Sequence, residues 1–348
     1  MKRTMVLLVV LAVAGTADAL PRYAARYGQS CILCHDNLSG GGLRTSYAGQ
    51  FLVPTELAAT AGEEAFDPEI APGVRVGGDL RVLVSRTNDD RDLLLVMQSD
   101  FYVGADLDDR ISFQWEQTRA GLGEAYGAAR VLPRGGHVRA GRLEPAYGWR
   151  FADHQLPARR HLLAPDGAND PARLLADGVE LGWRPLGLDV QAGLFGGGDH
   201  GDSHAVRVAG WRRLAGLNVA LGVSTLRRAG FGTPQRATAG FGAVARGRLA
   251  WLWQVDESRD GGERGRAVTH QASLNVRRGV DLVAGYGFQD PDRDRETGMR
   301  ERWSLAVDAL LTPHAGVLVQ GVREDPTPGP RVEAVDRWRG EAVLHVLF

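Results

Sequence analysis

From Gly73 onward, apolar residues alternate with polar or small residues at a period of two, as in the series from Leu217 to Val223. Side chains on a β-strand share a face at that period, so each such segment has one apolar face. Sixteen segments of this kind begin near residues 74, 92, 110, 123, 137, 177, 188, 203, 217, 236, 249, 266, 280, 301, 314 and 337. The sequence therefore predicts an all-β domain over residues 73–348.

The connections between these segments alternate in length, with the exception of "RAGLG", which is short but falls on the long-loop side. Short turns such as "PRGG" and "VRRG" follow one end of the strands, and longer charged loops such as "GGGDHGDS" and "QDPDRDRETG" follow the other end. This asymmetry and an even number of strands are typical of a transmembrane β-barrel of the outer membrane, here with 16 strands. A soluble β-sandwich is the alternative, and it would turn its apolar faces inward.

Three tryptophans and the end of the chain favour the membrane barrel. Trp183, Trp251 and Trp303 lie on apolar faces near strand ends, where the aromatic girdles of membrane barrels are found. The last segment, "EAVLHVLF", alternates up to Phe348 and resembles the terminal signal of bacterial outer-membrane barrels. The terminal signal places the end of the last strand in the periplasm. The short turns are then expected in the periplasm and the long loops outside the cell, with outer-membrane lipid around the apolar faces.

Residues 1–19 have the features of a secretory signal peptide. Lys2 and Arg3 precede a short apolar core, and the small residues Ala17 and Ala19 form a cleavage site. We therefore expect an exported mature chain. The formal net charge of −1 provides no basic excess for phosphates, which argues against nucleic acid as a partner.

Residues 20–72 differ from the rest in their predicted secondary structure. They contain the helix-like segments "PRYAARYG", "SCILCHDN" and "SYAGQFLVPTELAATAG". We expect a break at Pro54 in the third segment, followed by an acidic linker. Cys31 and Cys34 are the only 2 cysteines of the chain, and His35 follows directly. In an exported protein Cys-x-x-Cys-His is typical of one covalent c-type heme, with two thioethers and the histidine as an axial iron ligand.

Three other interpretations of this motif compete with heme attachment. A thioredoxin-like redox pair requires a βαβ context that is missing. A zinc site requires about four ligands, and no second Cys/His pair is nearby. A disulfide across so short a loop is compatible with the spacing, but it does not explain His35.

The segment of residues 20–72 has His35 as its only histidine and contains no methionine. Its roughly fifty residues also offer little apolar cover for a heme, so we expect the barrel to supply the second heme face. A small plug that enters the lumen from the periplasmic end meets both needs. We favour His154 as the second axial ligand, because its loop is the longest and such loops commonly fold into the pore of sixteen-stranded porins. His345 ranks next, and a five-coordinate iron is the remaining alternative.

Two further features of this segment bear on the heme. Arg44 is a candidate partner for a heme propionate. The run Gly40-Gly41-Gly42 would let the backbone approach the heme or the barrel wall closely, and a plain flexible turn is the alternative.

The signal peptide, the opening "PRYAARYGQSCILCH" and the porin-like remainder together resemble the monoheme cytochrome–porin fusions of the outer membrane, known as Fe(II) oxidases in iron-oxidising bacteria. The shared residues are Pro21, Ala25, Arg26, Gly28, Cys31, Cys34, His35 and Phe51. The specific motif covers only the N-terminal segment, and the rest is similar in architecture. The glycine run and the compact barrel depart from the best-known members and favour a sister group with a different electron donor or acceptor.

This resemblance implies a conduit that passes electrons across the outer membrane through one covalent heme c. The implied partners are an extracellular donor such as Fe(II), or an acceptor, and a periplasmic cytochrome; the implied activity is that of an Fe(II):cytochrome oxidoreductase. A porin whose transport is gated or sensed by redox state is one alternative, and a heme peroxidase or gas sensor is another. Sixteen-stranded porins are often trimers, so a homotrimer is also considered.

Overall fold

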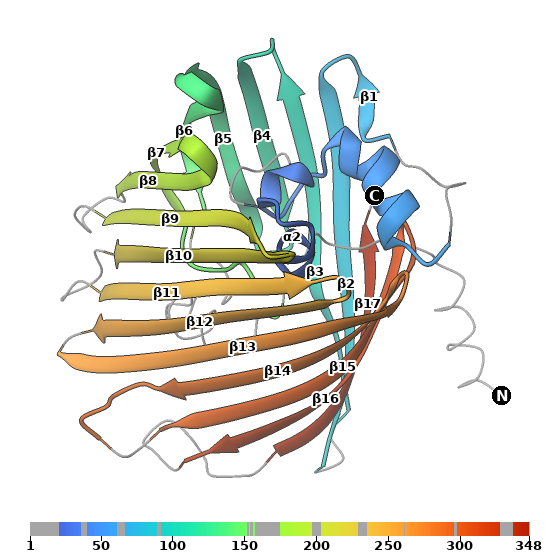
Figure 1. Ribbon diagram of the computed structural model, residues 1–348, viewed down its shortest axis with the longest axis vertical. Coiled ribbons are helices and arrows are strands. Elements are labelled where there is room, and N and C mark those ends of the chain that lie inside the picture. The colour runs from blue at the N-terminus through green and yellow to red at the C-terminus, as the bar shows by residue number, and fades with distance from the viewer. Residues whose placement is uncertain are drawn as a thin grey trace.

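Figure 1 shows the computed structural model, which describes residues 21–35, 40–60, 67–88, 92–151, 153, 156, 175–196, 203–228, 235–260, 262–295, 298–327 and 337–347. The expected signal peptide and Phe348 lie outside the described residues.

Within these ranges sixteen long strands form one closed antiparallel barrel. The strands are β2 (Val74–Thr87), β3 (Asp92–Asp106), β4 (Ile111–Thr118), β5 (Gly121–Leu132), β6 (Gly136–Leu143), β7 (Ala176–Trp183), β8 (Leu188–Gly196), β9 (Ser203–Leu214), β10 (Leu217–Arg228), β11 (Gln235–Arg246), β12 (Leu249–Asp260), β13 (Glu263–Arg277), β14 (Val280–Asp290), β15 (Arg300–Thr312), β16 (Ala315–Pro326) and β17 (Arg337–Leu347). Each pairs with the next along the chain, and β17 pairs with β2 through partners such as Leu344 and Val82. A short strand, β1 (Glu69–Ala71), adds to the edge of β2. The predicted strand number and order are confirmed, and each predicted start lies within three residues of the observed one.

The strands turn apolar faces outward and polar faces inward. Trp183, Trp251 and Trp303 are 41%, 44% and 52% exposed, near strand ends as predicted. Arg139 and Glu180 are instead completely buried inside the barrel. A soluble sandwich would show the opposite arrangement, so the pattern is that of a membrane barrel. Among the described residues, no helix has the length and apolar character needed to cross a membrane.

The N-terminal segment contains three short helices, α2 (Pro21–Tyr27), η1 (Cys31–Leu33) and η2 (Ala48–Leu57). The described residues within 21–60, which include these helices, are called the plug. Figure 1 shows α2 within the barrel, where it approaches β10, β11 and β12. Leu52, Val53 and Leu57 of η2 are buried with Leu310, at the end of β15 that leads into a short turn.

The expected break at Pro54 is wrong, because Pro54 lies inside η2. This helix is a π-helix, in which the backbone N–H of Ala58 donates to the carbonyl of Val53 at 2.8 Å. A proline lacks an N–H and its ring meets the carbonyl four residues earlier, so it disrupts the α-helical register. The wider π-helical turn accommodates the ring at this position.

The connection after β6 turns into the barrel. Trp149 and Phe151 are only 3% and 1% exposed. The hydroxyl of Tyr147 donates to Asp256 at 3.0 Å, and the indole N–H of Trp149 donates to the carbonyl of Gly242 at 3.1 Å. The expected loop comprises residues 149–176, and at its described start Trp149 and Phe151 are buried inside the barrel.

Candidate functional site

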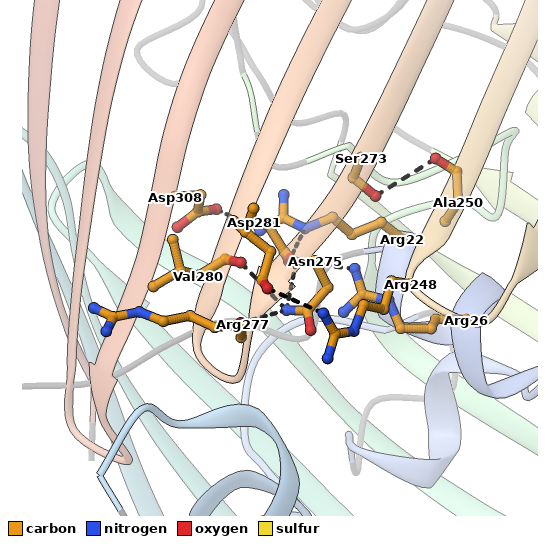
Figure 2. A network of polar contacts seen from close by, with 11 residues as sticks. Arg22, Arg26, Arg248, Ala250, Ser273, Asn275, Arg277, Val280, Asp281 and Asp308 are labelled. Carbon is orange, nitrogen blue, oxygen red and sulfur yellow. Dashed lines mark hydrogen bonds and ion pairs between the residues drawn. The ribbon is translucent and has the colours of Figure 1, made fainter.

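Two arginines of α2 anchor the plug to the inner wall of the barrel, as Figure 2 shows. Nε of Arg22 lies 3.2 Å from Oδ2 of Asp281, and Nη2 of Arg26 lies 3.0 Å from the other oxygen of the same carboxylate. Arg22 also pairs with Asp308 on β15. Because Arg22 and Arg26 are four residues apart, they share one helix face, and that face is fixed to β14 and β15.

The loop after β6 meets the plug from the opposite end of the barrel. Arg150 of this loop donates a hydrogen bond to the carbonyl of Gly40. Ala25 of α2 shares a buried cluster with Trp149 and Phe151, and small residues of β9 to β12 form the wall of that cluster. The segment that contains Cys31 is therefore enclosed in the lumen between the anchored helix and the inserted loop.

Cys31, Cys34 and His35 lie on one turn. The backbone N–H groups of Cys34 and His35 both donate to the carbonyl of Cys31 at 3.1 Å, and both cysteines are free thiols. His35 is 2% exposed, and its Nδ1 lies 3.3 Å from the carbonyl oxygen of Gly42. With Nδ1 as the donor of that bond, the lone pair of the ring is on Nε2, which is then the nitrogen that could act as a ligand.

The glycine run has a structural reason. Gly40, Gly41 and Gly42 have φ angles of +86°, +78° and +67°. A Cβ atom on Gly40 would lie 2.8 Å from Cβ of Cys31, and one on Gly41 would lie 3.1 Å from Cζ of Arg150. The left-handed backbone and these contacts both favour glycine. The run brings the backbone close to the motif and to the barrel's inserted loop, which a plain flexible turn would not require.

The surroundings of the two thiols keep them protonated. Burial, and to a lesser extent the neighbouring Cys31, raises the pKa of Cys34 to about 11. Burial also raises the pKa of Cys31, although the positive charge of Arg207 opposes it. A reactive Cys-x-x-Cys pair depends on a lowered thiol pKa, so these environments do not favour the thioredoxin-like interpretation.

Arg44 lies beside the motif, where it forms an isolated antiparallel bridge with His35. Its Nη1 donates to the carbonyl of Pro313 at 3.2 Å. Its Nη2 is buried, and none of the described residues accepts a hydrogen bond from it. A buried guanidinium nitrogen of this kind is suited to a carboxylate, and a heme propionate supplies one.

The residues present fit a covalent c-type heme in donor type and spacing. Two free thiols and an imidazole lie on one turn, and a buried guanidinium lies next to them. The cavity beside Cys31 measures about 40 Å³, which is room for water and not for a porphyrin. A heme placed in this cavity would need residues 144–150, which line it, to move away from Cys31. Within the described ranges, no group of three or more His, Cys, Asp or Glu side chains is arranged to hold a metal ion.

Of the two candidates for the second axial ligand, the structure describes only one. His154 lies outside the described residues. His345 faces the lumen from β17, and its Nε2 lies 2.8 Å from Oδ1 of Asp79 and 3.2 Å from Nε of Arg81. His345 is thus held by β2.

Sequence reasoning missed three groups that position the site: the acceptors Asp281 and Asp308, and Arg150 of the inserted loop. The four-residue spacing of Arg22 and Arg26 was the available signal for a charged helix face. It did not identify the acceptors, because Asp281 is 259 residues from Arg22.

Comparison with known proteins identifies the type of fold through similar solved structures. No family model matches the chain, and no curated protein matches it. A loop L8 deletion mutant of OmpT, an outer membrane protein of Vibrio cholerae, matches 79% of this chain and 99% of its own at 14% identity, with a TM-score of 0.58. The anion-selective porin from Comamonas acidovorans matches the same shares at 14% identity, with a TM-score of 0.59. OprB of Pseudomonas putida matches 79% of this chain and 94% of its own at 10% identity, with a TM-score of 0.58. The protein therefore has a porin-type β-barrel fold.

Proposed function

We propose that this protein is an electron conduit of the outer membrane. It carries one covalent heme c on Cys31 and Cys34, and it passes electrons between an extracellular donor such as Fe(II), or an acceptor, and a periplasmic cytochrome. The observation that carries the proposal is the position of the Cys-x-x-Cys-His turn. It is enclosed in the lumen, with α2 anchored to Asp281 on one side and Arg150 bonded to Gly40 on the other.

The outer surface supports a membrane location. Exposed leucines, valines and tryptophans follow the outward parity of the strands, and the interior holds the charged side chains. The porin-type fold supports the outer membrane in particular. In this orientation the short turns are periplasmic, and the plug lies near the periplasmic end, where Arg44 reaches the turn at Pro313. A trimeric form of OmpT is among the similar structures, which supports considering a homotrimer.

Each residue of the turn has a separate task in this proposal. Cys31 and Cys34 hold the porphyrin through thioethers, and Nε2 of His35 binds the iron. The carbonyl of Gly42 orients the imidazole through Nδ1. Arg44 supplies a buried positive charge for a propionate. The heme supplies one-electron Fe(III)/Fe(II) chemistry. His154 remains the favoured second axial ligand, and His345 ranks below it because Asp79 and Arg81 already hold its ring.

Side-chain packing inside the lumen supports the conduit over a gated pore. The plug and the loop after β6 pack together inside the barrel, and Trp149 is buried there against Trp211 and Phe241. An open pore requires a water-filled path past these side chains. A peroxidase or gas sensor instead requires an open iron position, which a high-spin spectrum would reveal.

The test is heme reduction in proteoliposomes. The donor is supplied outside, and an oxidised cytochrome is trapped inside. The proposal predicts that the heme and the trapped cytochrome are both reduced, and that a Cys31→Ser/Cys34→Ser barrel without heme leaves the cytochrome oxidised. If the heme is reduced while the trapped cytochrome stays oxidised, the conduit is excluded.

A further inference from the structure

Helix η2 of the plug exposes a pair of stacked aromatic side chains. Tyr47, which precedes the helix, and Phe51 within it are 49% and 57% exposed. Their ring centroids are 6.2 Å apart, with an interplanar angle of 27°. The opposite face of the helix is buried through Leu52, Val53 and Leu57. A helix that has its own buried face and still exposes two neighbouring aromatic rings is typical of a binding surface.

This aromatic pair is directly connected to the Cys-x-x-Cys-His turn. The backbone N–H of Thr45 donates to the carbonyl of Cys34 at 3.0 Å, and its hydroxyl donates to the carbonyl of Leu33 at 3.0 Å. The same hydroxyl accepts a hydrogen bond from the backbone N–H of Ala48 at 3.1 Å, at the start of η2. Thr45 therefore links the cysteine turn to η2, the helix that carries the exposed rings, through hydrogen bonds to both.

The helix lies across the short-turn end of the barrel. Arg44, just before it, reaches the carbonyl of Pro313 in the turn between β15 and β16. At the other end of the helix, Arg278 of the turn between β13 and β14 donates to the carbonyls of Pro54 and Thr60, each at 2.9 Å. The aromatic pair is thus carried on the mouth that the short turns surround.

The exposed charges that the structure describes at this mouth are more often positive than negative. Among the described residues of the plug, β1 and the short-turn ends, eight arginines and five carboxylates are exposed. The arginines are Arg110, Arg130, Arg134, Arg212, Arg213, Arg246, Arg248 and Arg277, and the carboxylates are Glu56, Asp67, Glu69, Asp108 and Asp109. A positive rim around an apolar centre complements an acidic protein surface, and it accelerates association of such a partner at low ionic strength.

We infer that Tyr47 and Phe51 form the apolar centre of a docking surface for a small acidic electron-carrier protein of the periplasm. The inference rests on the proposed function and deepens it, because it locates where the partner exchanges electrons with the buried heme. A surface of this kind is suited to a small, short-lived redox complex, in which a few aromatic contacts fix the geometry and charges set the rate of encounter.

The experiment measures binding separately from electron transfer. The full barrel in lipid nanodiscs is immobilised, and two soluble cytochromes c of similar size are passed over it, one of negative and one of positive net charge. We expect the acidic cytochrome to bind more tightly than the basic one, and its affinity to fall as salt is raised. Phe51→Ala should weaken this binding by about tenfold, in the range expected for truncation of a central aromatic residue.

The matched control is Leu107→Ala. Leu107 is 68% exposed on another short turn, beside Asp108 and Asp109, and its replacement should leave the affinity unchanged. Equal binding by Phe51→Ala and the unsubstituted barrel would overturn the docking surface. So would tighter binding of the basic cytochrome, or a loss in Phe51→Ala of affinity for phosphatidylglycerol vesicles and not for the cytochrome, which would identify a lipid anchor.

A heme-free Cys31→Ser/Cys34→Ser barrel separates this inference from the proposed function. Retained binding of the acidic cytochrome by that variant supports the surface whatever the outcome of the proteoliposome test. A barrel that reduces the trapped cytochrome, but whose rate is the same in Phe51→Ala and the unsubstituted protein, keeps the conduit and removes the docking surface.

Discussion

Arg22 of the plug and Asp281 of β14 form an ion pair with an Nε–Oδ2 distance of 3.2 Å, and both side chains are almost completely buried. The same carboxylate also accepts a hydrogen bond from Arg26, at 3.0 Å. Asp281 contacts both arginines of the plug, whereas Asp308 contacts only Arg22, so the position of the Cys-x-x-Cys-His turn inside the barrel depends mainly on the Asp281 carboxylate.

Asp281→Asn should therefore release the plug while the barrel remains folded. Removal of one partner from a buried ion pair costs about 3–5 kcal/mol when the remaining charge is left without compensation. Asp308 keeps its pair with Arg22, so in this variant the loss falls mainly on Arg26. We expect the plug to become sensitive to limited proteolysis in detergent micelles, with heme content lowered and the heat resistance of the barrel retained. Glu257→Gln is the control, since its pair with Arg293 is 67% and 48% exposed and should contribute little. Equal protease resistance in both variants would show that the pair does not hold the plug.

Gly40→Ala should disturb the cysteine turn more than Gly42→Ala. Both glycines have positive φ, so each alanine introduces backbone strain of about 1–2 kcal/mol. Only at Gly40 would the new Cβ also meet a motif atom, at 2.8 Å from Cβ of Cys31; at Gly42 the nearest atom is a ring carbon of Tyr102, at an ordinary 3.7 Å. The measurement is heme per barrel by pyridine hemochrome. A larger loss in Gly42→Ala would mean that backbone strain outweighs the contact with Cys31.

The thiol of Cys34 should be alkylated slowly in the folded, heme-free chain. Burial raises its pKa from the ordinary value near 9 to about 11, so the folded thiol stays protonated where the denatured thiol ionises. The folded plug therefore binds more protons between these two values, and its stability falls as the pH rises through that window. Iodoacetamide modification followed by mass spectrometry should show the rate increasing near pH 11 in the folded chain and near pH 9 in denaturant. An identical profile in both states would contradict the burial of this thiol.

The barrel was predictable from sequence because its signal is repeated in sixteen segments, with turns and loops that alternate in length. The one exception in that pattern is the short "RAGLG" connection between β4 and β5, on the long-loop side. The outward orientation of Trp183, Trp251 and Trp303 follows from the same alternation. A local irregularity such as Met97 does not follow, because it lies at a β-bulge between the pairs Val82–Val96 and Arg81–Gln98. A bulge inserts one residue and interrupts the alternation, and no residue type announces it.

Of the candidate site, only the Cys-x-x-Cys-His motif could be recognised in the sequence. Cys31, Cys34 and His35 are adjacent in sequence, so their chemistry can be recognised without a fold. The residues that hold them in place are not adjacent: Arg22 meets Asp281 across 259 positions, and Arg150 meets Gly40 across 110. Such pairs depend on how the barrel closes, which the alternation of single strands does not specify.

The second axial ligand should be found by comparing two histidine variants. His154→Ala should convert a low-spin ferric heme to a high-spin one, as read from the visible and magnetic circular dichroism spectra. His345→Ala should leave the spectrum low-spin, because Asp79 and Arg81 engage Nε2 of His345. The reverse result would assign the ligand to His345 and would require its contacts with β2 to open when the heme is attached.

Conductance should report whether the inserted loop closes the lumen. Trp149 is 3% exposed and packs edge-to-face on Trp211 and Phe241, with ring centroids 5.7 Å and 5.3 Å away. Trp149→Ala removes the largest side chain of this contact, at a cost of about 3–5 kcal/mol to the packing of the loop. Single barrels in planar bilayers should therefore conduct little as the unsubstituted protein and clearly more as Trp149→Ala. Trp183→Ala, which removes an outward-facing tryptophan, should keep the low conductance. A large conductance in the unsubstituted barrel would instead favour a pore whose permeability the heme regulates, because a lumen open to ions leaves the plug with no sealing role.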